Sequence, residues 1–194
     1  MKSSKKIILG SNSPRRRELL AGLDLEFTVD TGNNFEEKVE DGIPARIVPL
    51  VLSQGKSRGF HRLLEMDEIL ITADTVVIVD GKVLGKPHSR EEAVQMLEML
   101  SGRTHEVVTG VTIRDYDSEA SFADSTSVTF DVMSRETIDY YIDRYKPFDK
   151  AGAYGIQEWI GFAAITGING SFYNVMGFPV NRVWKELQIF LQRA

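Results

Sequence analysis

Cysteine is absent from the 194 residues, and histidine occurs only three times. Without cysteine the chain can form neither disulfides nor thiolate metal sites, and a reducing compartment is permitted. The spacing of His61, His88 and His105 matches no metal-ligand pattern, so a zinc site is not expected. The sequence also lacks the Gly-x-Ser-x-Gly nucleophile motif and the Gly-x-x-x-x-Gly-Lys-Ser/Thr phosphate loop. Covalent catalysis therefore has no candidate residue that stands out.

Long apolar runs are lacking as well. The run after the basic N-terminal residues extends only from Ile7 to Leu9, which is too short for a secretory signal. No later segment reaches the length of a membrane span. The net charge of -5 argues against a polymeric nucleic acid as partner, because binding to the phosphate backbone needs a basic surface. We therefore expect a cytoplasmic protein that binds neither a membrane nor a nucleic-acid polymer.

The apolar content of 42% is enough for one substantial core, and no internal repeat or composition break marks a domain boundary. Strands and helices alternate along the chain, with hairpin signals among them, so we expect a single α/β domain over 1–194 with a mixed β-sheet. Strands are predicted at 7–10, 27–31, 69–79, 107–113 and 125–132, helices at 13–22, 44–64, 89–102 and from 134 to before 147, a hairpin at 162–176 around Asn169-Gly170, and a terminal helix from Pro179.

The segment 149–157 combines charge, glycine and one amide in a way that no packed helix or strand requires. Gly152 and Gly155 allow the backbone to approach a ligand closely. Gln157 can offer a donor and an acceptor at once, which suits a planar polar group such as a nucleotide base. A glycine-bearing turn between two elements explains the same pattern, so this segment alone leaves both interpretations open.

An anion site is indicated at 11–17, where Ser13 can cap a helix that begins with Pro14. Free N–H groups and the helix dipole favour a phosphate there, and Arg15, Arg16 and Arg17 add permanently charged planar donors. Three cations at the start of a helix oppose its dipole. A purely structural design would place them at the other end, so the functional interpretation is favoured.

Asp74 interrupts an apolar strand, where an ionised carboxylate needs a compensating partner. Lys86 can return beside it after the hairpin at Asp80-Gly81, and a divalent metal is the other candidate partner. The carboxylate can then bind metal or deprotonate water, although a structural ion pair remains an alternative. Lys56 interrupts a helical apolar stripe. It can be explained either as a lysine that extends its charged end to solvent or as a phosphate ligand.

These cations, acids and the base-reading segment fit hydrolysis at a nucleoside triphosphate chain. Several positive centres would stabilise charge that develops on phosphoryl oxygens, and a metal could lower the pKa of the attacking water.

Five motifs, followed by Gly170-Ser171-Phe172-Tyr173-Asn174-Val175-Met176-Gly177, resemble the Maf family in order and spacing. They are Ser11-Asn12-Ser13-Pro14-Arg15-Arg16, Ala73-Asp74-Thr75, Gly85-Lys86-Pro87, Ser101-Gly102-Arg103-Thr104-His105 and the segment 149–157. The resemblance implies a nucleoside triphosphate pyrophosphatase that uses Mg²⁺ or Mn²⁺ and cleaves between the α- and β-phosphates. It also implies the elongated α/β fold of inosine triphosphatases, with two lobes flanking a cleft.

The resemblance carries roles to individual positions. Asp74 matches the family's proton acceptor and, with Glu36, its metal-binding acids. The family's phosphate-contacting positions match Lys56, Lys86 and Arg16, and both lysines are expected to be catalytic. Its substrate-specificity positions match Arg15, Thr75 and Gln157. Ser13 is expected among the substrate-binding residues.

The combination of arginine, threonine and glutamine resembles the subgroup that acts on dTTP, UTP and modified pyrimidine nucleotides. Two alternatives stay open: a regulatory binding protein of septum formation, and a pyrophosphatase of different base preference, such as one for 7-methyl-GTP. A homodimer is a further expectation from the resemblance.

Overall fold

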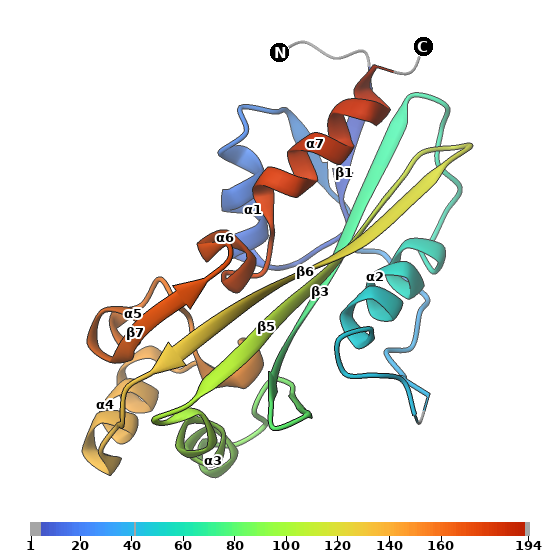
Figure 1. The fold of residues 1–194 in the computed structure, drawn as a ribbon. Helices are drawn as coiled ribbons and strands as arrows, with labels where there is room; N and C mark the ends of the chain where they lie inside the picture. Colours follow the sequence, from blue (N-terminus) through green and yellow to red (C-terminus); the bar gives the residue numbers. More distant parts are fainter. Residues whose placement is uncertain (1–4, 41, 193–194) are drawn as a thin grey trace. The chain divides into compact units, whose positions relative to one another are not determined.

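The computed structural model describes residues 5–40 and 42–192, which fall into two compact units. The first unit comprises Met1–Asp74, Thr109–Asp124 and Gly177–Ala194, and the second comprises Thr75–Val108 and Ser125–Met176. Three long strands, drawn as the longest arrows in Figure 1, contribute residues to both units: β3 (Glu68–Val79), β5 (Thr104–Arg114) and β6 (Glu119–Phe130).

In the first unit, β1 (Lys6–Leu9) runs parallel to β2 (Phe27–Val29) on one side and to β3 on the other. The strand order is β2-β1-β3-β5-β6. The runs 7–9 and 69–71 are fully buried, as parallel strands covered on both faces require. The helices of this unit are α1 (Pro14–Ala21), α2 (Val48–Arg58) and α7 (Val180–Leu191).

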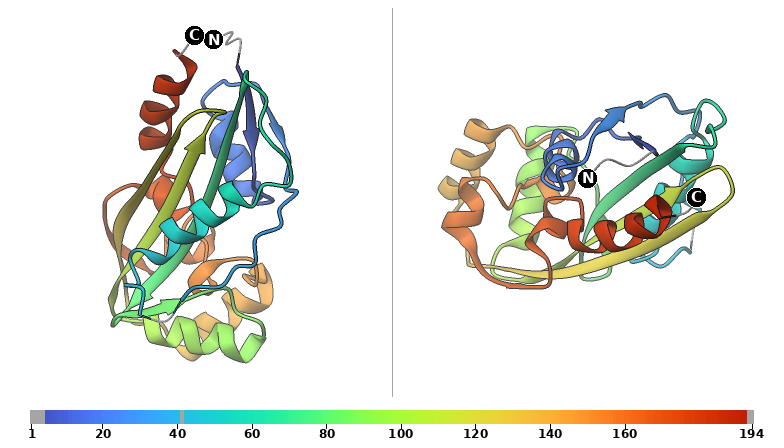
Figure 2. Two further views of the ribbon diagram at one scale, coloured as in Figure 1. Left: turned by 90° about the vertical axis from the view of Figure 1, so that its right-hand side faces the viewer. Right: turned by 90° about the horizontal axis from the view of Figure 1, so that it is seen from above.

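In the second unit, β3 turns back through Asp80-Gly81 to pair antiparallel with β4 (Lys82–Leu84). At the other side of the sheet, β7 (Ile165–Asn169) pairs antiparallel with β6. The helical elements are α3 (Arg90–Leu100), α4 (Arg135–Tyr145), the 3-10 turn η1 (Ala151–Ala153), α5 (Trp159–Ala164) and α6 (Phe172–Val175). Figures 1 and 2 agree that α3 and α4 lie side by side. Parallel and antiparallel pairs in one sheet confirm the predicted mixed α/β fold.

Local sequence signals placed most element ends correctly. Ser13, Ser89 and Ser134 each cap a helix with a side-chain oxygen that accepts a backbone N–H. Asp80 and Gly81 both have positive φ, as a two-residue hairpin turn of this hand requires.

Two predicted elements were wrong. The helix expected at 44–64 is limited to α2, with Pro49 in its first turn and Gly59 at its end, and Leu63 beyond it is 86% exposed. The hairpin expected at 162–176 does not form either: residues 162–164 belong to α5, β7 ends at Asn169, and Ser171 then caps α6 instead of a second strand. The partner of β7 is β6, about forty residues earlier, a pairing that no local turn signal encodes.

A buried aromatic cluster in the second unit contains a histidine that faces no charged group. His105 lies edge-on to Phe130 and Tyr154, and its Nε2 is 2.7 Å from the Tyr154 hydroxyl. Burial lowers the pKa of His105 to about 4 from its ordinary value of 6.5. The imidazole is therefore neutral in the folded protein at neutral pH.

Among the described residues, 5–40 and 42–192, no helix is both long and apolar enough to cross a membrane.

The buried histidine predicts a pH-dependent stability. Below about pH 6.5 the unfolded chain binds a proton at His105, whereas the folded protein binds it only near pH 4. The free energy of unfolding therefore falls as the pH falls through this window. The loss should total roughly 3 kcal/mol, at about 1.4 kcal/mol for each unit of pKa shift. Urea unfolding at about pH 7 and about pH 4.5 measures it.

His105→Gln should show a flatter pH dependence, whereas His88→Gln, a change at an exposed position, should behave as the wild type does. An equally steep loss of stability in His105→Gln would contradict the assignment.

Candidate functional site

At the start of α1, Arg16 holds three separate segments of the first unit together. Its Nε donates to the carbonyl oxygen of Gly177 at 2.9 Å, and one terminal nitrogen donates to the carbonyl of Ala73 at 2.9 Å and to the hydroxyl of Ser11 at 3.2 Å. Burial lowers the pKa of Arg16, and the nearby Asp74 carboxylate opposes the shift. An arginine stays charged under such shifts, so a cation is fixed beside the end of the buried part of β3.

The cation that compensates Asp74 is Lys56. Its Nζ is 2.6 Å from Oδ1 of Asp74 and 3.0 Å from Oε1 of Glu37. The side chains of Lys56 and Asp74 are only 18% and 16% exposed, so this shared contact is largely screened from water. The expectation that Lys86 fills this role is not needed to explain the buried carboxylate, because Lys56 already balances it.

Close packing presses α2 against the sheet and so brings Lys56 to this position. Gly110 on β5 has no room for a side chain, since an added Cβ would lie 2.3 Å from the carbonyl of Pro49. Hydroxyl groups complete the contact. The hydroxyl oxygen of Ser53 is 3.0 Å from that of Thr112, and the backbone carbonyl of Ser53 accepts a hydrogen bond from the hydroxyl of Thr72. The helix therefore has little freedom to slide along the sheet.

The segment before α2 is held on the helix by side chains that the sequence did not single out. The ring of Phe35 occupies the space above Gly55, where an added Cβ would lie 2.2 Å from Cζ of the ring, and Cβ of Phe35 crowds Gly59. Asn33 donates to the carbonyl of Lys56 at 2.6 Å and accepts from the N–H of Phe35 at 2.8 Å. These contacts fix the backbone two residues before Glu37 and explain how that carboxylate reaches Lys56.

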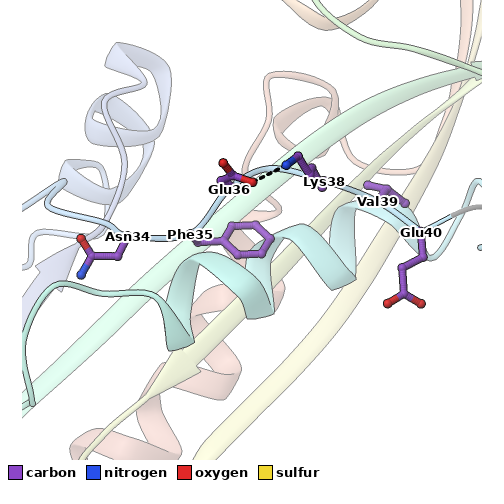
Figure 3. A pocket seen from close by; sticks show the side chains of 6 residues that line it. All are labelled: Asn34, Phe35, Glu36, Lys38, Val39 and Glu40. Atoms are coloured by element: carbon purple, nitrogen blue, oxygen red, sulfur yellow. Dashed lines mark hydrogen bonds and ion pairs between the residues drawn. The ribbon is translucent and has the colours of Figure 1, made fainter.

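Of the two neighbouring acids in this segment, Glu37 and not Glu36 joins the cluster around Asp74. Glu36 makes an ion pair with Lys38, and both side chains are well exposed. Figure 3 shows this pair on one side of the segment and Phe35 directed at α2, where residues of the segment line a hollow of about 660 Å³. The sequence offered no periodic pattern that could separate two consecutive acids in an irregular segment. The metal role of Glu36 therefore stays a prediction. The geometry favours Glu37 over Glu36 for that role.

The donor set of this cluster fits a hard divalent cation. Among the described residues no group of three or more histidine, aspartate or glutamate side chains is arranged to hold a metal by itself. Glu37 and Asp74, however, already share one positive charge, that of Lys56. In phosphate-processing sites Mg²⁺ is typically held by only one or two carboxylates, with substrate phosphates and water completing its shell. Two carboxylates around a cation therefore suffice for Mg²⁺ or Mn²⁺ together with a triphosphate.

In the second unit, the backbone ties the glycine before Lys86 to the segment that carries Gln157. The N–H of Gly152 donates to the carbonyl of Gly85 at 3.0 Å. Gly152 has a φ of 67°, and a Cβ there would lie 2.8 Å from a methyl group of Val77. The positive φ and the packing on Val77 account for glycine here, and close approach of the backbone to a ligand stays a prediction. Lys86 itself is exposed.

Gln157 presents an unused acceptor in this segment. Its Oε1 is buried and lacks a hydrogen-bond partner within the described part of the chain. A buried carbonyl without a partner costs about 1–3 kcal/mol, a cost that a ligand donor can remove. The role of Gln157 in recognising a base stays a prediction, and this oxygen is the atom to which it would apply.

The candidate residues fall into two groups. The first unit contains Ser13, Arg15, Arg16, Glu36, Lys56 and Asp74, and the second contains Thr75, Lys86 and Gln157. Within the first group the structure brings Lys56 and Asp74 into contact and adds Glu37. Ser13 caps α1, and Arg15 lies half-buried in the first turn of that helix. The roles of these side chains toward a substrate remain predictions.

Comparison with known proteins gives a consistent result. A family profile described as Maf-like protein matches residues 6–190. A protein of Phocaeicola vulgatus named dTTP/UTP pyrophosphatase is 51% identical over 94% of this chain and 95% of its own length. One of Porphyromonas gingivalis with the same name is 52% identical over 95% and 94%. A solved HAM1 protein from Coxiella burnetii superposes with a TM-score of 0.50 at 12% identity, covers 95% of this chain and 99% of that one, and shows a shared fold.

The contact between Phe35 and α2 predicts an unusual effect of Gly55→Ala. Helix propensity alone favours alanine by about 1 kcal/mol. The ring of Phe35 occupies the space that the methyl group needs, so we expect a net loss of about 1–3 kcal/mol in the free energy of unfolding. Urea unfolding of Gly55→Ala, Phe35→Ala and the double variant measures the coupling. In the double variant Gly55→Ala should become neutral or stabilising; a stabilised single variant would refute the contact.

Proposed function

Because the chain belongs to the Maf family, we propose that it is a metal-dependent nucleoside triphosphate pyrophosphatase that hydrolyses dTTP and UTP to the monophosphate and pyrophosphate. Relatives of that name match it over nearly their whole length. The single observation that carries the proposal is the half-buried Asp74 carboxylate, oriented by Lys56 and joined through it to Glu37.

In this proposal Asp74 accepts the proton of the attacking water. Lys56 contacts Oδ1, and we assign Oδ2 to the water. Holding one oxygen of the carboxylate fixes the direction of the other, and such positioning is a large part of general-base catalysis. Arg16 holds the backbone next to Asp74, because it donates a hydrogen bond to the carbonyl of Ala73.

Glu37 and Asp74 are the residues that would hold a divalent cation, with Glu36 as the neighbouring acid expected from the resemblance. The cation, Mg²⁺ or Mn²⁺, would supply positive charge to the phosphates and lower the pKa of bound water. Lys56, Lys86 and Arg15 add cationic groups for phosphate oxygens, with Ser13 at the capped start of α1.

Base recognition is assigned to Gln157, assisted by Thr75. Uracil and thymine share one hydrogen-bonding edge, an N–H between two carbonyl oxygens, and the amide of Gln157 can accept from the N–H and donate to a carbonyl. Cytosine has an acceptor in place of that N–H and an amino group in place of the neighbouring carbonyl, so a Gln157 amide held in this orientation would set acceptor against acceptor and donor against donor. A preference for dTTP and UTP follows from this edge.

The same proposal places the protein in the cytoplasm, where nucleoside triphosphates are available, and retains the homodimer expected from the resemblance. The rival function is a regulatory binding protein of septum formation. The retained set of acids and cations around Asp74 favours the enzyme, because binding alone does not require a proton acceptor oriented by a lysine.

Pyrophosphate release from a panel of nucleotides, with and without Mg²⁺ or Mn²⁺, tests the proposal directly. We expect release from dTTP and UTP that depends on the metal. Asp74→Asn keeps the shape of the side chain but removes the base, so kcat should fall by a factor of about 10² or more. Circular dichroism would verify that the variant is folded.

Asp67→Asn is the matched control, because Asp67 pairs with Lys6 at the surface and is not among the proposed site residues. Wild-type rates in Asp74→Asn would remove the proposed base. Absence of pyrophosphate release from every nucleotide by the wild type would favour the binding protein.

The two neighbouring acids give a sharp test of the metal assignment. Glu37→Gln should raise the Mn²⁺ concentration for half-maximal activity by about tenfold or more, as loss of a metal-site carboxylate does. Glu36→Gln should change it by less than about twofold, because Glu36 pairs with Lys38 instead. The reverse order of the two effects would restore Glu36 as the metal-binding acid.

A further inference from the structure

A network of charged and polar side chains lies buried behind the segment that carries Gln157, entirely within the second unit. Lys150 makes ion pairs with Asp149 at 2.7 Å and with Glu158 at 3.0 Å. The other oxygen of Glu158 accepts a hydrogen bond from the hydroxyl of Tyr141, a side chain on α4 that is fully buried. The side chains of Lys150 and Glu158 are only 10% and 19% exposed.

One hydroxyl group in this network holds both ends of the turn around Gln157. Tyr141 donates to Glu158 and accepts from the N–H of Gly155 at 3.0 Å. The turn is closed by a bond from the N–H of Glu158 to the carbonyl of Gly155 at 3.0 Å. Gln157 therefore projects from a short piece of backbone whose first and last residues share one buried partner.

The first residue of the turn, Gly155, lies close to two side chains of the network. Gly155 has an ordinary backbone conformation, yet a Cβ there would lie 3.0 Å from Cδ of Glu158 and 3.0 Å from Cε of Lys150. A larger residue at this position would therefore press on two members of the network. Burial and the neighbouring Glu158 raise the pKa of Tyr141 far above its ordinary value, so its hydroxyl keeps the proton that it donates.

Stability alone is a weak reason for such a network. Removing a lysine and a glutamate from water costs several kcal/mol per ion, roughly, and well-packed apolar side chains often do as well or better. A fully satisfied polar network does, however, fix geometry, because every member has a direction as well as a position. Gln157, the residue with the unpaired buried oxygen, lies in the turn between Gly155 and Glu158, whose ends the network holds.

We propose that Tyr141 and Glu158 are positioning residues for base selection, which hold the amide of Gln157 in the orientation that matches the N–H and carbonyl edge of uracil and thymine. This inference rests on the proposed function and extends it to residues that touch no substrate. Lys150 balances the charge of Glu158 and completes the network.

Tyr141→Phe tests the proposal, since it removes the hydroxyl and keeps the ring. The measurement is kcat/KM for UTP and for CTP. The ratio of the two should fall about tenfold, the equivalent of one lost orienting hydrogen bond. The Mn²⁺ concentration for half-maximal activity should be unchanged, because Glu37 and Asp74 are untouched. Tyr145→Phe, on the same helix and stacked on Tyr141, is the matched control and should keep the wild-type ratio.

A merely structural role for Tyr141 would lower the rates with both nucleotides equally and leave their ratio unchanged, which would overturn the proposal. If Tyr141→Phe fails to fold, Gly155→Ala provides the same readout, because its methyl group would press on the side chains of Glu158 and Lys150. A wild type without activity on any nucleotide would overturn the proposed function and this inference together. An active wild type with unchanged ratios in the variants would overturn this inference alone.

Discussion

The ammonium group of Lys56, shared between Asp74 and Glu37, is the interaction on which the first unit depends. Two carboxylates turned toward the same space repel each other and lose solvation, so a cation must accompany them. Bringing it there requires α2 to lie tightly on the sheet, with Gly110 beneath Pro49, and the preceding segment to lie on α2, with Phe35 over Gly55. Much of the packing in this unit can be understood as the support of one ion-pair cluster.

The second unit also contains a largely buried ion pair, that of Lys150 with Glu158. Its recognition segment needs a precise orientation more than it needs charge at its surface. The charges belong to Lys150 and Glu158, and the hydroxyl of Tyr141 links the carboxylate of Glu158 to the backbone N–H of Gly155. In the proposed enzyme, bond cleavage and base selection are thereby assigned to separate clusters, each with its own rigid support.

The likeness to a HAM1 protein concerns the fold, whereas the proposed activity rests on the family and on the local chemistry. These two lines of support are independent. The family points to pyrophosphatases of pyrimidine nucleotides. The local chemistry consists of a carboxylate oriented by a lysine in the first unit and a buried amide oxygen without a partner in the second.

The sequence by itself determined the elements whose signals are local. Ser13 with Pro14 fixed the start of α1, Asp80-Gly81 fixed the hairpin, and the apolar residues on both sides of Asp74 fixed a buried strand in which that carboxylate needed a partner. These features depend on backbone preferences and burial within a few residues, which composition and order encode directly.

Only the tertiary structure decided which side chains meet. That Lys56 compensates Asp74, that Glu37 rather than Glu36 joins them, and that β7 pairs with β6 all depend on segments far apart in the chain. Consecutive acids look alike in a sequence, and a strand carries no label for its partner. Their roles are set by the packing of glycines and rings that bring distant backbone segments together, and such packing exists only once the chain has folded.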